Sequence, residues 1–428
     1  MTSGWQLVCV QCGTSWPALS LRYRCDCGGT LDVQHDFAKA REHLTLDALD
    51  QRRASSDFLD RSGVWRFREL ILPLEDPTLR QVAVPRGEGN THLYECPGLA
   101  REVGLQQLFL KHEGENPTAS FKDRGMAVGI AVARHLGLER VACASTGNTS
   151  ASMASYAALA GLKAYVFVPK GKIAAGKLSQ AIAYGAQTLQ IQGDFDEAMT
   201  LVEEVCNQVG IYLLNSVNPF RIEGQKAIAF ELLQDLQWRV PDWVVLPGGN
   251  LGNNTAIAKG FIELMALGLI DRLPRIAVVQ ASGANPLHTA FHSRKELVPI
   301  RAETIASAIK IGNPVSWRKS LRGLHATQGT VTEVTDAEIL DAKALVDAAG
   351  IGAEPASCAT VAGLRRLVRE AIIHPKDLVC GVLTGHVLKD TGVIVDYHQG
   401  QLKGIPTGKA NPPQVVESSL EALLAKLN

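Results

Sequence analysis

LQQLFLKHEGENPTASFKDRGMAVGIAVARHLG, residues 105–137, shows the pattern that decides the fold. Its apolar run at 105–112 predicts a short buried strand, and the small and apolar residues at 120–137 recur with helical spacing. The alternation repeats along the chain, with further strands predicted at 140–145, 163–169, 188–193, 211–216, 242–249 and 275–283. Short apolar strands between amphipathic helices are typical of parallel sheets covered on both faces.

So many strand–helix units exceed what one sheet comfortably holds. We therefore predict an α/β fold with two doubly wound parallel-sheet domains and the active site in the cleft between them. The predicted units are a small N-terminal segment at 1–34, an N-terminal α/β domain at 35–225, a C-terminal α/β domain at 226–410 and a C-terminal helix at 411–428. Ligands of such folds bind at the carboxyl ends of strands, so chemistry is expected in the strand-to-helix turns.

The composition is that of an ordinary globular protein, with 46% hydrophobic and 20% charged residues among 428. Lysine plus arginine and aspartate plus glutamate both number 43, so the net charge favours neither nucleic acid nor an anionic membrane as a partner. No apolar run reaches about 18 residues, which predicts no membrane span. The start, MTSGWQLVCV, lacks a basic segment ahead of a long apolar one, so we expect no secretory signal and a cytoplasmic protein.

Four of the nine cysteines lie in the first 27 residues, at Cys9, Cys12, Cys25 and Cys27. Two short cysteine pairs, each near glycine, predict a zinc ribbon whose four thiolates form a closed, structural site. The second pair is Cys-x-Cys rather than the commoner Cys-x-x-Cys, and four reduced thiols without a metal are the alternative. The odd total and the wide scatter of the other cysteines argue against a disulfide framework.

Lys122 lies in NPTASFKDRG, residues 116–125, at the predicted start of a helix. With Ser120 as the N-cap, the lysine falls in the first turn, where free backbone N–H groups and the helix dipole disfavour a cation. Its pKa should therefore be low, as a nucleophilic or Schiff-base amine requires. The alternative is a solvated surface charge, the common role of lysine.

Three other strand-to-helix turns carry small and polar residues. ASTGNTSAS at 144–152 leaves backbone N–H groups free for an anion and includes the amide of Asn148, although an ordinary N-cap cluster would look the same. LPGGNLGNN at 246–254 lacks the P-loop and dinucleotide patterns, so it predicts a site for a lone phosphate, or else a plain glycine-rich turn. VLTGHVLKD at 382–390 ends a strand with the hydroxyl of Thr384.

One cofactor accounts for all four turns. Pyridoxal 5′-phosphate needs an amine for its aldehyde, an anion site for its phosphate, a donor for its phenolate oxygen and a partner for its ring nitrogen. The four turns offer one group for each need.

Several motifs resemble the threonine synthase family, which has the tryptophan-synthase-β-like, or fold-type II, pyridoxal-phosphate fold. They stand in order between about residues 60 and 395: GVWRFREL, GEGNT, NPTASFKDRG, STGNTS, NSVNPFRIEGQK, PGGNLGN, IGNP, EPAS and LTGH. The cysteine-rich head also resembles the start of many members. Two positions depart from the family pattern: His92 stands where proline is usual, and Val387 where glycine is common.

The resemblance implies a role for each matched residue. Lys122 matches the Schiff-base lysine, Asn148 the contact to the 3′-oxygen of the pyridine, and Thr384 the hydroxyl beside the ring nitrogen. The cofactor phosphate cup matches Gly248, Gly249, Asn250, Leu251, Gly252 and Asn253. The substrate-binding residues match Ser145, Thr146 and Thr149 near the carboxylate, and Asn215, Ser216 and Arg221 near a phosphate, with Lys172 as a further candidate.

The resemblance implies the conversion of O-phospho-L-homoserine and water to L-threonine and phosphate, a step of threonine biosynthesis with Lys122 as the catalytic base. Rivals on the same fold are cysteate formation from O-phosphoserine and a serine or threonine dehydratase, the latter opposed by the extra anion site at Arg221. A catalytically silent zinc-ribbon binding protein is a rival of another class, opposed by the intact Lys122 and Asn148. Homo-oligomers are common on this fold, although the sequence shows no interface.

Overall fold

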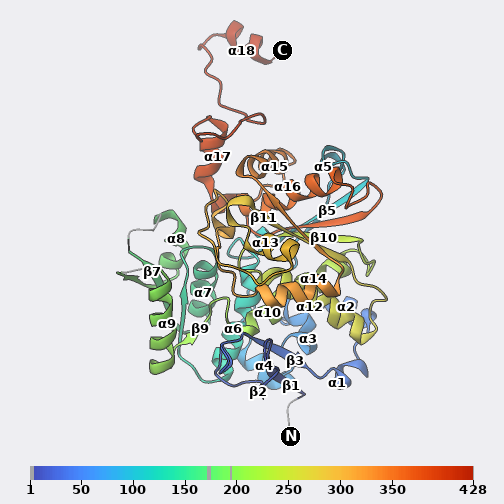
Figure 1. The fold of residues 1–428 in the computed structure, drawn as a ribbon, viewed down its shortest axis with the longest axis vertical. Helices are drawn as coiled ribbons and strands as arrows, with labels where there is room; N and C mark the ends of the chain where they lie inside the picture. Colours follow the sequence, from blue (N-terminus) through green and yellow to red (C-terminus); the bar gives the residue numbers. More distant parts are fainter. Residues whose placement is uncertain (1–3, 171–174, 193–194, 428) are drawn as a thin grey trace.

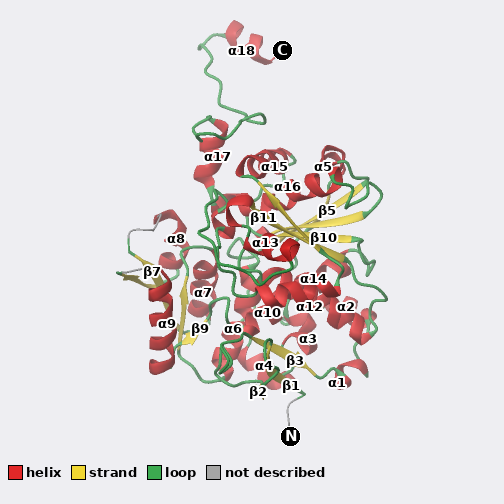
Figure 2. Cartoon of the chain, viewed as in Figure 1, coloured by secondary structure: helices red, strands yellow, loops and turns green. Residues whose placement is uncertain are grey.

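The computed structural model describes residues 4–170, 175–192 and 195–427 (Figure 1). Its strands form a six-stranded, a four-stranded and a three-stranded sheet, with helices packed on the two larger ones (Figure 2). All strand pairs of the larger sheets are parallel except one at an edge, so the predicted α/β fold with parallel sheets is confirmed. Lys172 lies outside the described residues. Within those residues, no helix is long and apolar enough to cross a membrane.

The six-stranded sheet has the order β12 (Thr330–Val334), β11 (Arg275–Ala281), β10 (Trp243–Pro247), β13 (Leu378–Leu383), β5 (Gln107–His112) and β4 (Leu93–Glu95). β4 runs antiparallel to β5, and the other pairs are parallel. Every residue of β10 and β13 is buried, as expected for central strands covered on both faces. The turns that follow these two neighbouring strands therefore meet at one edge of the sheet.

The four-stranded sheet is parallel, in the order β8 (Gln187–Ile191), β7 (Lys163–Pro169), β6 (Arg140–Ala144) and β9 (Tyr212–Leu213). Helices α7 (Asn148–Leu159) and α9 (Phe195–Val209) pack on it, and α8 (Ala175–Ala183) packs on α7 (Figure 1). Helix α6 (Lys122–His135) follows β5 and packs on α7 and on α10 (Pro219–Gln225). α6 is buried from Asp123 to Ala133, and its apolar residues share one core with residues of both larger sheets.

The strands of the larger sheet do not come from one continuous part of the sequence. β4 and β5 lie early in the sequence, yet β5 pairs with β13 in the larger sheet. The predicted boundary between residues 225 and 226 therefore does not separate the two sheets. The C-terminal helix is shorter than predicted, because α18 spans only Leu420–Leu427.

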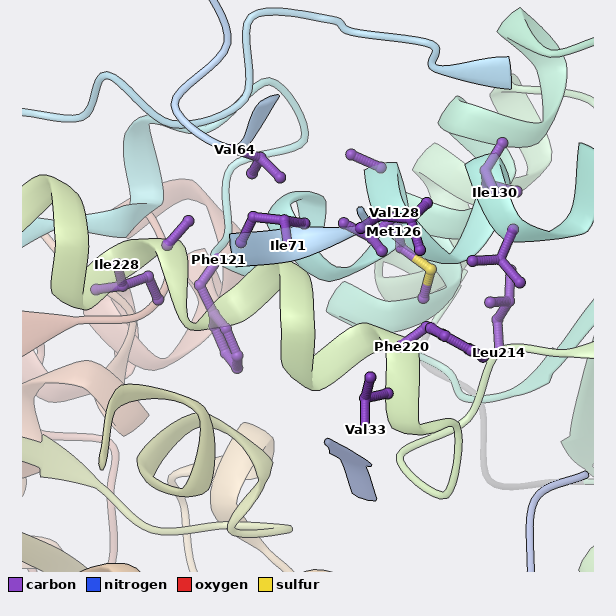
Figure 3. Close-up of a cluster of buried hydrophobic side chains, with 14 of the residues drawn as sticks. Val33, Val64, Ile71, Phe121, Met126, Val128, Ile130, Leu214, Phe220 and Ile228 are labelled. Carbon is purple, nitrogen blue, oxygen red and sulfur yellow. The ribbon is translucent and has the colours of Figure 1, made fainter. Parts of the chain in front are cut away.

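The N-terminal sheet is antiparallel, in the order β2 (Ser15–Pro17), β1 (Trp5–Cys9) and β3 (Leu31–His35). Leu7, Leu31 and Val33 are fully buried in the same apolar core as residues of α6 and α10. Val33 lies beside Phe220 of α10 in that core (Figure 3). The N-terminal sheet is thus packed into the body of the molecule.

The remaining α-helices are α1 (Ala38–Arg41), α2 (Leu46–Arg53), α3 (Arg68–Ile71), α4 (Asp76–Val82), α5 (Pro97–Val103), α11 (Ala227–Asp235), α12 (Gly252–Leu267), α13 (Pro286–Ser293), α14 (Trp317–Ala326), α15 (Asp336–Ala348), α16 (Pro355–Arg369) and α17 (Thr391–His398). Short 3-10 helices are η1 (Trp65–Phe67), η2 (Glu113–Glu115), η3 (Ser282–Ala284), η4 (Ser307–Ile309) and η5 (Val387–Lys389).

Candidate active site

Lys122 is the first residue of α6, at the helix start that the sequence predicts. The predicted N-cap is wrong: Phe121 holds that position, and in the described chain the buried Ser120 hydroxyl has no partner. The reason is that Ser120 pairs with Gly385 in an isolated β-bridge, while Phe121 N donates to Thr384 O (3.0 Å). These backbone contacts bring the lysine to the end of β13.

Lys122 is partly buried, and the pKa of its amine lies near neutrality. Burial lowers this pKa to about 7, the positive charge of Arg221 acts in the same direction, and Glu354 opposes them. Nζ lies 3.8 Å from the centre of the Phe121 ring. An amine with this pKa can act as nucleophile and as base at neutral pH.

Asn148 and Thr384 both face the buried carboxyl group of Glu354. Asn148, the first residue of α7, donates from Nδ2 to Glu354 Oε2 (3.1 Å), and Thr384 Oγ1 donates to Oε1 (3.5 Å). Burial raises the pKa of Glu354, against the opposing effects of the Asn148 hydrogen bond and the charges of Lys389 and Lys122. A carboxyl group therefore lies among three of the residues predicted for the site.

Glu354 and Ser357 contact the predicted site residues Asn148 and Thr384, and sequence reasoning missed them. Ser357 Oγ accepts from Thr384 N (2.8 Å) and Gly385 N (2.9 Å), and it lies 2.9 Å from Thr384 Oγ1. Both residues belong to the EPAS motif, at the cap and first turn of α16. The motif was the available signal, but these contacts join segments far apart in the sequence, so the motif alone does not reveal them.

The turn between β10 and α12 leads into the N-terminus of α12, where backbone N–H groups are free to bind a ligand. Leu251 adopts the left-handed conformation (φ 63°), and a Cβ at Gly248 would lie 2.5 Å from Val278 Cγ1, so the turn demands glycine there. The first N–H groups of a helix have no partner inside it. Both atoms of the buried Asn253 amide also have no partner among the described residues. Such a cup suits a phosphate group.

These groups fit pyridoxal 5′-phosphate. The open helix start and the unpartnered amide of Asn253 suit its phosphate, and the amine of Lys122 suits its aldehyde. The side-chain amide of Asn148 is a donor for its phenolate oxygen, and Thr384 offers a hydroxyl for its ring nitrogen. The groups come from turns of both larger sheets.

Arg221 of α10 is a buried cation that contacts no carboxylate of the described residues. Its Nη1 donates to Leu214 O (3.1 Å), and its Nε has no partner in the part of the chain that the structure describes. Burial lowers the pKa of Arg221 to about 10. A buried guanidinium with unused donors is costly without an anion, and its planar fork matches a phosphate.

Asn215 ties the predicted substrate loop to β6. Its Oδ1 accepts from Ala144 N (2.8 Å), and its Nδ2 donates to Ala144 O (3.2 Å), directly before the turn at 145–149. The other predicted substrate residues that are described, Ser145, Thr146, Thr149 and Ser216, are partly buried. The two segments therefore lie together, while their contact with a substrate stays a prediction.

A buried ionic network includes Arg124, which follows Lys122 by two residues in α6. Arg124 of α6 pairs with Glu113 (2.6 Å) and Glu231 (2.8 Å). Glu231 of α11 also binds Lys111 (2.7 Å) and Arg66 (2.9 Å). All five side chains are at most 1% exposed. The network fixes the first turn of α6, which explains structurally why Arg66 stands in the GVWRFREL motif.

The four N-terminal cysteines come together, as predicted. Their Sγ atoms lie 3.6 Å apart for Cys9 and Cys27, 3.4 Å for Cys12 and Cys25, and 3.5 Å for Cys12 and Cys27. All four atoms lie within 4.8 Å of one another. Four thiols at this spacing have the donor chemistry of a structural zinc site.

The chain matches the family described as pyridoxal-phosphate dependent enzyme over residues 84–385. It is 44% identical to a threonine synthase of Methanocaldococcus jannaschii, over 92% of this chain and 95% of that relative. It is 43% identical to a threonine synthase of Methanosarcina acetivorans over 98% of both chains. It is 39% identical to threonine synthase 2, chloroplastic, of Arabidopsis thaliana, over 94% of this chain and 80% of that relative.

Two solved structures share the fold at low sequence identity. Maize serine racemase superposes with a TM-score of 0.62 at 19% identity, over 76% of this chain and 97% of that one. A fungal L-serine ammonia-lyase from Rhizomucor miehei gives 0.63 at 20% identity, over 73% and 99%. The fold, the site and the sequence relatives agree: the chain belongs to the pyridoxal-phosphate-dependent enzymes and, among them, to the threonine synthase family.

Proposed function

We propose that this chain converts O-phospho-L-homoserine and water to L-threonine and phosphate. The observation that carries the proposal is the partly buried amine of Lys122, with a pKa of about 7. The charge of a buried arginine, Arg221, helps to lower this pKa, and Arg221 contacts no carboxylate of the described chain. The threonine synthase relatives support it, because 39% to 44% identity extends over at least 92% of this chain.

Lys122 supplies the base. Bound pyridoxal 5′-phosphate, held by Lys122, Asn148, Thr384 and the turn at 248–253, would supply a conjugated ring that draws electrons from the substrate α-carbon. The neutral Nζ takes the proton from Cα and becomes an ammonium; only after it has given this proton up, and is neutral again, can it take one from Cβ. Its pKa of about 7 suits both directions of transfer, since the amine can also return a proton at neutral pH.

Arg221 selects a phosphorylated substrate. Its guanidinium binds the phosphate and stabilises the charge that this group carries when it leaves Cγ. Dehydration of serine or threonine would leave the buried cation without an anion, which is unfavourable. Cysteate formation from O-phosphoserine remains the second candidate, because its substrate carries the same phosphate one carbon closer to Cα.

Phosphate release from O-phosphohomoserine and from O-phosphoserine with sulfite tests the proposal on the holoenzyme, with the amino-acid product identified. We expect turnover of O-phosphohomoserine with threonine as product. Arg221→Lys should lower kcat/KM by roughly 10- to 100-fold, because an ammonium cannot bind two oxygens as a fork does. Arg318→Lys, in an exposed pair with Glu296, is the matched control and should have no effect. Turnover of O-phosphoserine alone would assign the second reaction.

The alternative hypothesis, a catalytically silent binding protein, predicts a different result. It should bind no pyridoxal 5′-phosphate covalently, so the purified chain would show no visible absorption band that depends on Lys122. We expect such a band in the wild-type protein and its loss in Lys122→Ala.

We also propose one structural zinc ion on Cys9, Cys12, Cys25 and Cys27. Elemental analysis of the purified chain should find one zinc per chain, and Cys9→Ser with Cys12→Ser should remove it. Cys96→Ser, a buried cysteine of another cluster, is the control and should keep the metal. Four reduced thiols that react without metal release would refute the zinc site.

A further inference from the structure

The connection between β2 and β3 of the N-terminal segment contacts the turn that leads to the proposed phosphate site. Tyr23 is buried, and its hydroxyl accepts a hydrogen bond from Leu213 N (2.7 Å). Leu213 O accepts a hydrogen bond from Asn218 Nδ2 (3.0 Å). Both the N–H and the C=O group of Leu213 are therefore bound by side chains. Asn215 and Ser216, both predicted to bind substrate, lie between Leu213 and Asn218. The path of the turn is therefore set by Tyr23 together with the pairing of β9 and Asn215 to β6.

The N-terminal sheet contacts α10 on both sides of Arg221. Trp5 of β1 lies edge-on to Phe220, with ring centres 6.0 Å apart. His35 of β3 places Nε2 2.6 Å from Glu223 Oε2, and both side chains are at most 1% exposed. Arg221 is thus flanked, one residue before and two residues after, by contacts to the N-terminal sheet.

Buried and partly buried charges extend this contact to α12, which begins at the proposed cofactor cup. Lys259 of α12 bridges Glu223 (2.5 Å) and Asp32 of β3 (3.2 Å). Lys226 joins Glu223 (2.5 Å) to Glu263 of α12 (2.6 Å). Breaking a buried pair leaves an uncompensated charge and is strongly unfavourable, so β3, α10 and α12 are held as one unit.

Helix α14 fixes the N-terminal sheet from another direction. Lys319 Nζ donates to Leu31 O, and Arg322 donates to Val10 O. Lys319 is buried, so its ammonium depends on this contact and on the nearby Asp32 and Glu223. The sheet is therefore attached to the body on more than one side.

We propose that residues 4–37 are a positioning element for the substrate phosphate site, with Tyr23 and His35 as positioning residues. Neither side chain touches the substrate; they hold the turn at 213–218 and α10, and these carry Asn215, Ser216 and Arg221. A displacement of about 1 Å in a group that orients a substrate can cost about 100-fold in rate, so a small shift of α10 is enough to matter. The inference rests on the proposed function, because it concerns the same anion site.

Kinetics of Tyr23→Phe in the holoenzyme test the proposal. The substitution keeps the ring and removes the acceptor of Leu213 N, so the fold should survive. We expect KM for O-phosphohomoserine to rise roughly fivefold, which is the order of one lost hydrogen bond, with a smaller change in kcat. His35→Gln should raise KM in the same direction, and the double variant should raise it further.

Tyr397→Phe is the matched control. Tyr397 is also buried, and its hydroxyl lies 3.2 Å from Asp341 Oδ1 in a cluster that includes none of the site residues. Both tyrosine variants should lower Tm, and only Tyr23→Phe should raise KM. If Tyr23→Phe lowers Tm as the control does and leaves KM unchanged, the segment only stabilises the fold and the proposal is overturned.

Inorganic phosphate provides a readout that does not depend on turnover. Calorimetric titration of the same holoenzymes with phosphate should show weaker binding in Tyr23→Phe than in the wild type and in Tyr397→Phe. If the wild type fails to use O-phosphohomoserine yet this difference is found, the proposed reaction is wrong and the positioning role stands. Equal phosphate affinity in all three proteins would refute the positioning role.

Discussion

Burial is the largest cause of the low pKa of Lys122. Because burial lowers its pKa to about 7, the neutral amine predominates above that pH. An ordinary lysine has a pKa of about 10.4, so its neutral amine predominates only above that higher pH. In the cofactor-free protein, carbamylation of Lys122 by cyanate should therefore rise with pH through a midpoint near 7, as read by peptide mass spectrometry. Exposed lysines serve as internal controls with midpoints near 10. Reaction of Lys122 with a midpoint near 10 would contradict the prediction.

Glu354 sets the charge balance around that amine. Its carboxylate raises the pKa of Lys122, against the effects of burial and Arg221, so its replacement by a neutral amide should lower the lysine pKa further. In Glu354→Gln we expect the cyanate midpoint of Lys122 to move below 7. Glu370→Gln, an exposed residue at the other end of α16, should leave the midpoint unchanged. A midpoint that stays the same or rises in Glu354→Gln would show that the carboxyl group is protonated or remote from the amine.

Single residues were predictable where chemistry and local sequence coincide. The helix start singles out Lys122 and the motif singles out Arg221, and their roles in the site stay predictions. Ser120 was assigned wrongly as an N-cap, because its backbone pairs with Gly385, a residue distant in the sequence. Glu354 was missed for the same reason: its partners Asn148 and Thr384 meet it only in the folded chain.

At the scale of elements, α6 depends on charges that arrive from other elements. Glu231 of α11 binds Arg124, Lys111 and Arg66, and all these groups are buried. Glu231→Gln leaves three cations with less compensation, so the free energy of unfolding should fall by about 3–5 kcal/mol. Urea unfolding of the cofactor-free protein measures it. Glu296→Gln breaks an exposed pair with Arg318 and should cost at most about 1 kcal/mol; similar losses in both variants would argue against the network.

At the scale of elements, the periodicity of the sequence predicts the positions of strands but not their pairing. The predicted strands at 163–169, 188–193 and 242–249 correspond to β7, β8 and β10 within two residues at each end, because apolar runs and turn residues are local signals. Which strand pairs with which is not local. β5 joins β13 across more than 260 residues, so the division of the chain at 225 could not anticipate the composition of the sheets.

At the scale of the whole molecule, the proposed cofactor site needs both larger sheets in place. Asn148 follows β6 of the smaller sheet, whereas Thr384 and the cup at 248–253 follow β13 and β10 of the larger one. A cofactor held by both sheets should stabilise the native state by mass action, about 2.7 kcal/mol at a free concentration of 100 times Kd. Thermal unfolding of the cofactor-free protein with and without pyridoxal 5′-phosphate would measure this linkage.

Asn253→Ala tests whether the side-chain amide of Asn253 contributes to the stabilisation by the cofactor. Both atoms of its buried amide have no partner among the described residues, so removing them should leave the Tm of the cofactor-free protein unchanged or raise it. The rise in Tm on adding pyridoxal 5′-phosphate should shrink, because the cup loses a donor. Asn254→Ala is the neighbouring control: Asn254 Nδ2 donates to Ser320 Oγ (2.8 Å), so this variant should unfold earlier without cofactor. If Asn253→Ala also unfolds earlier and keeps the full cofactor response, the amide supports the helix rather than the phosphate.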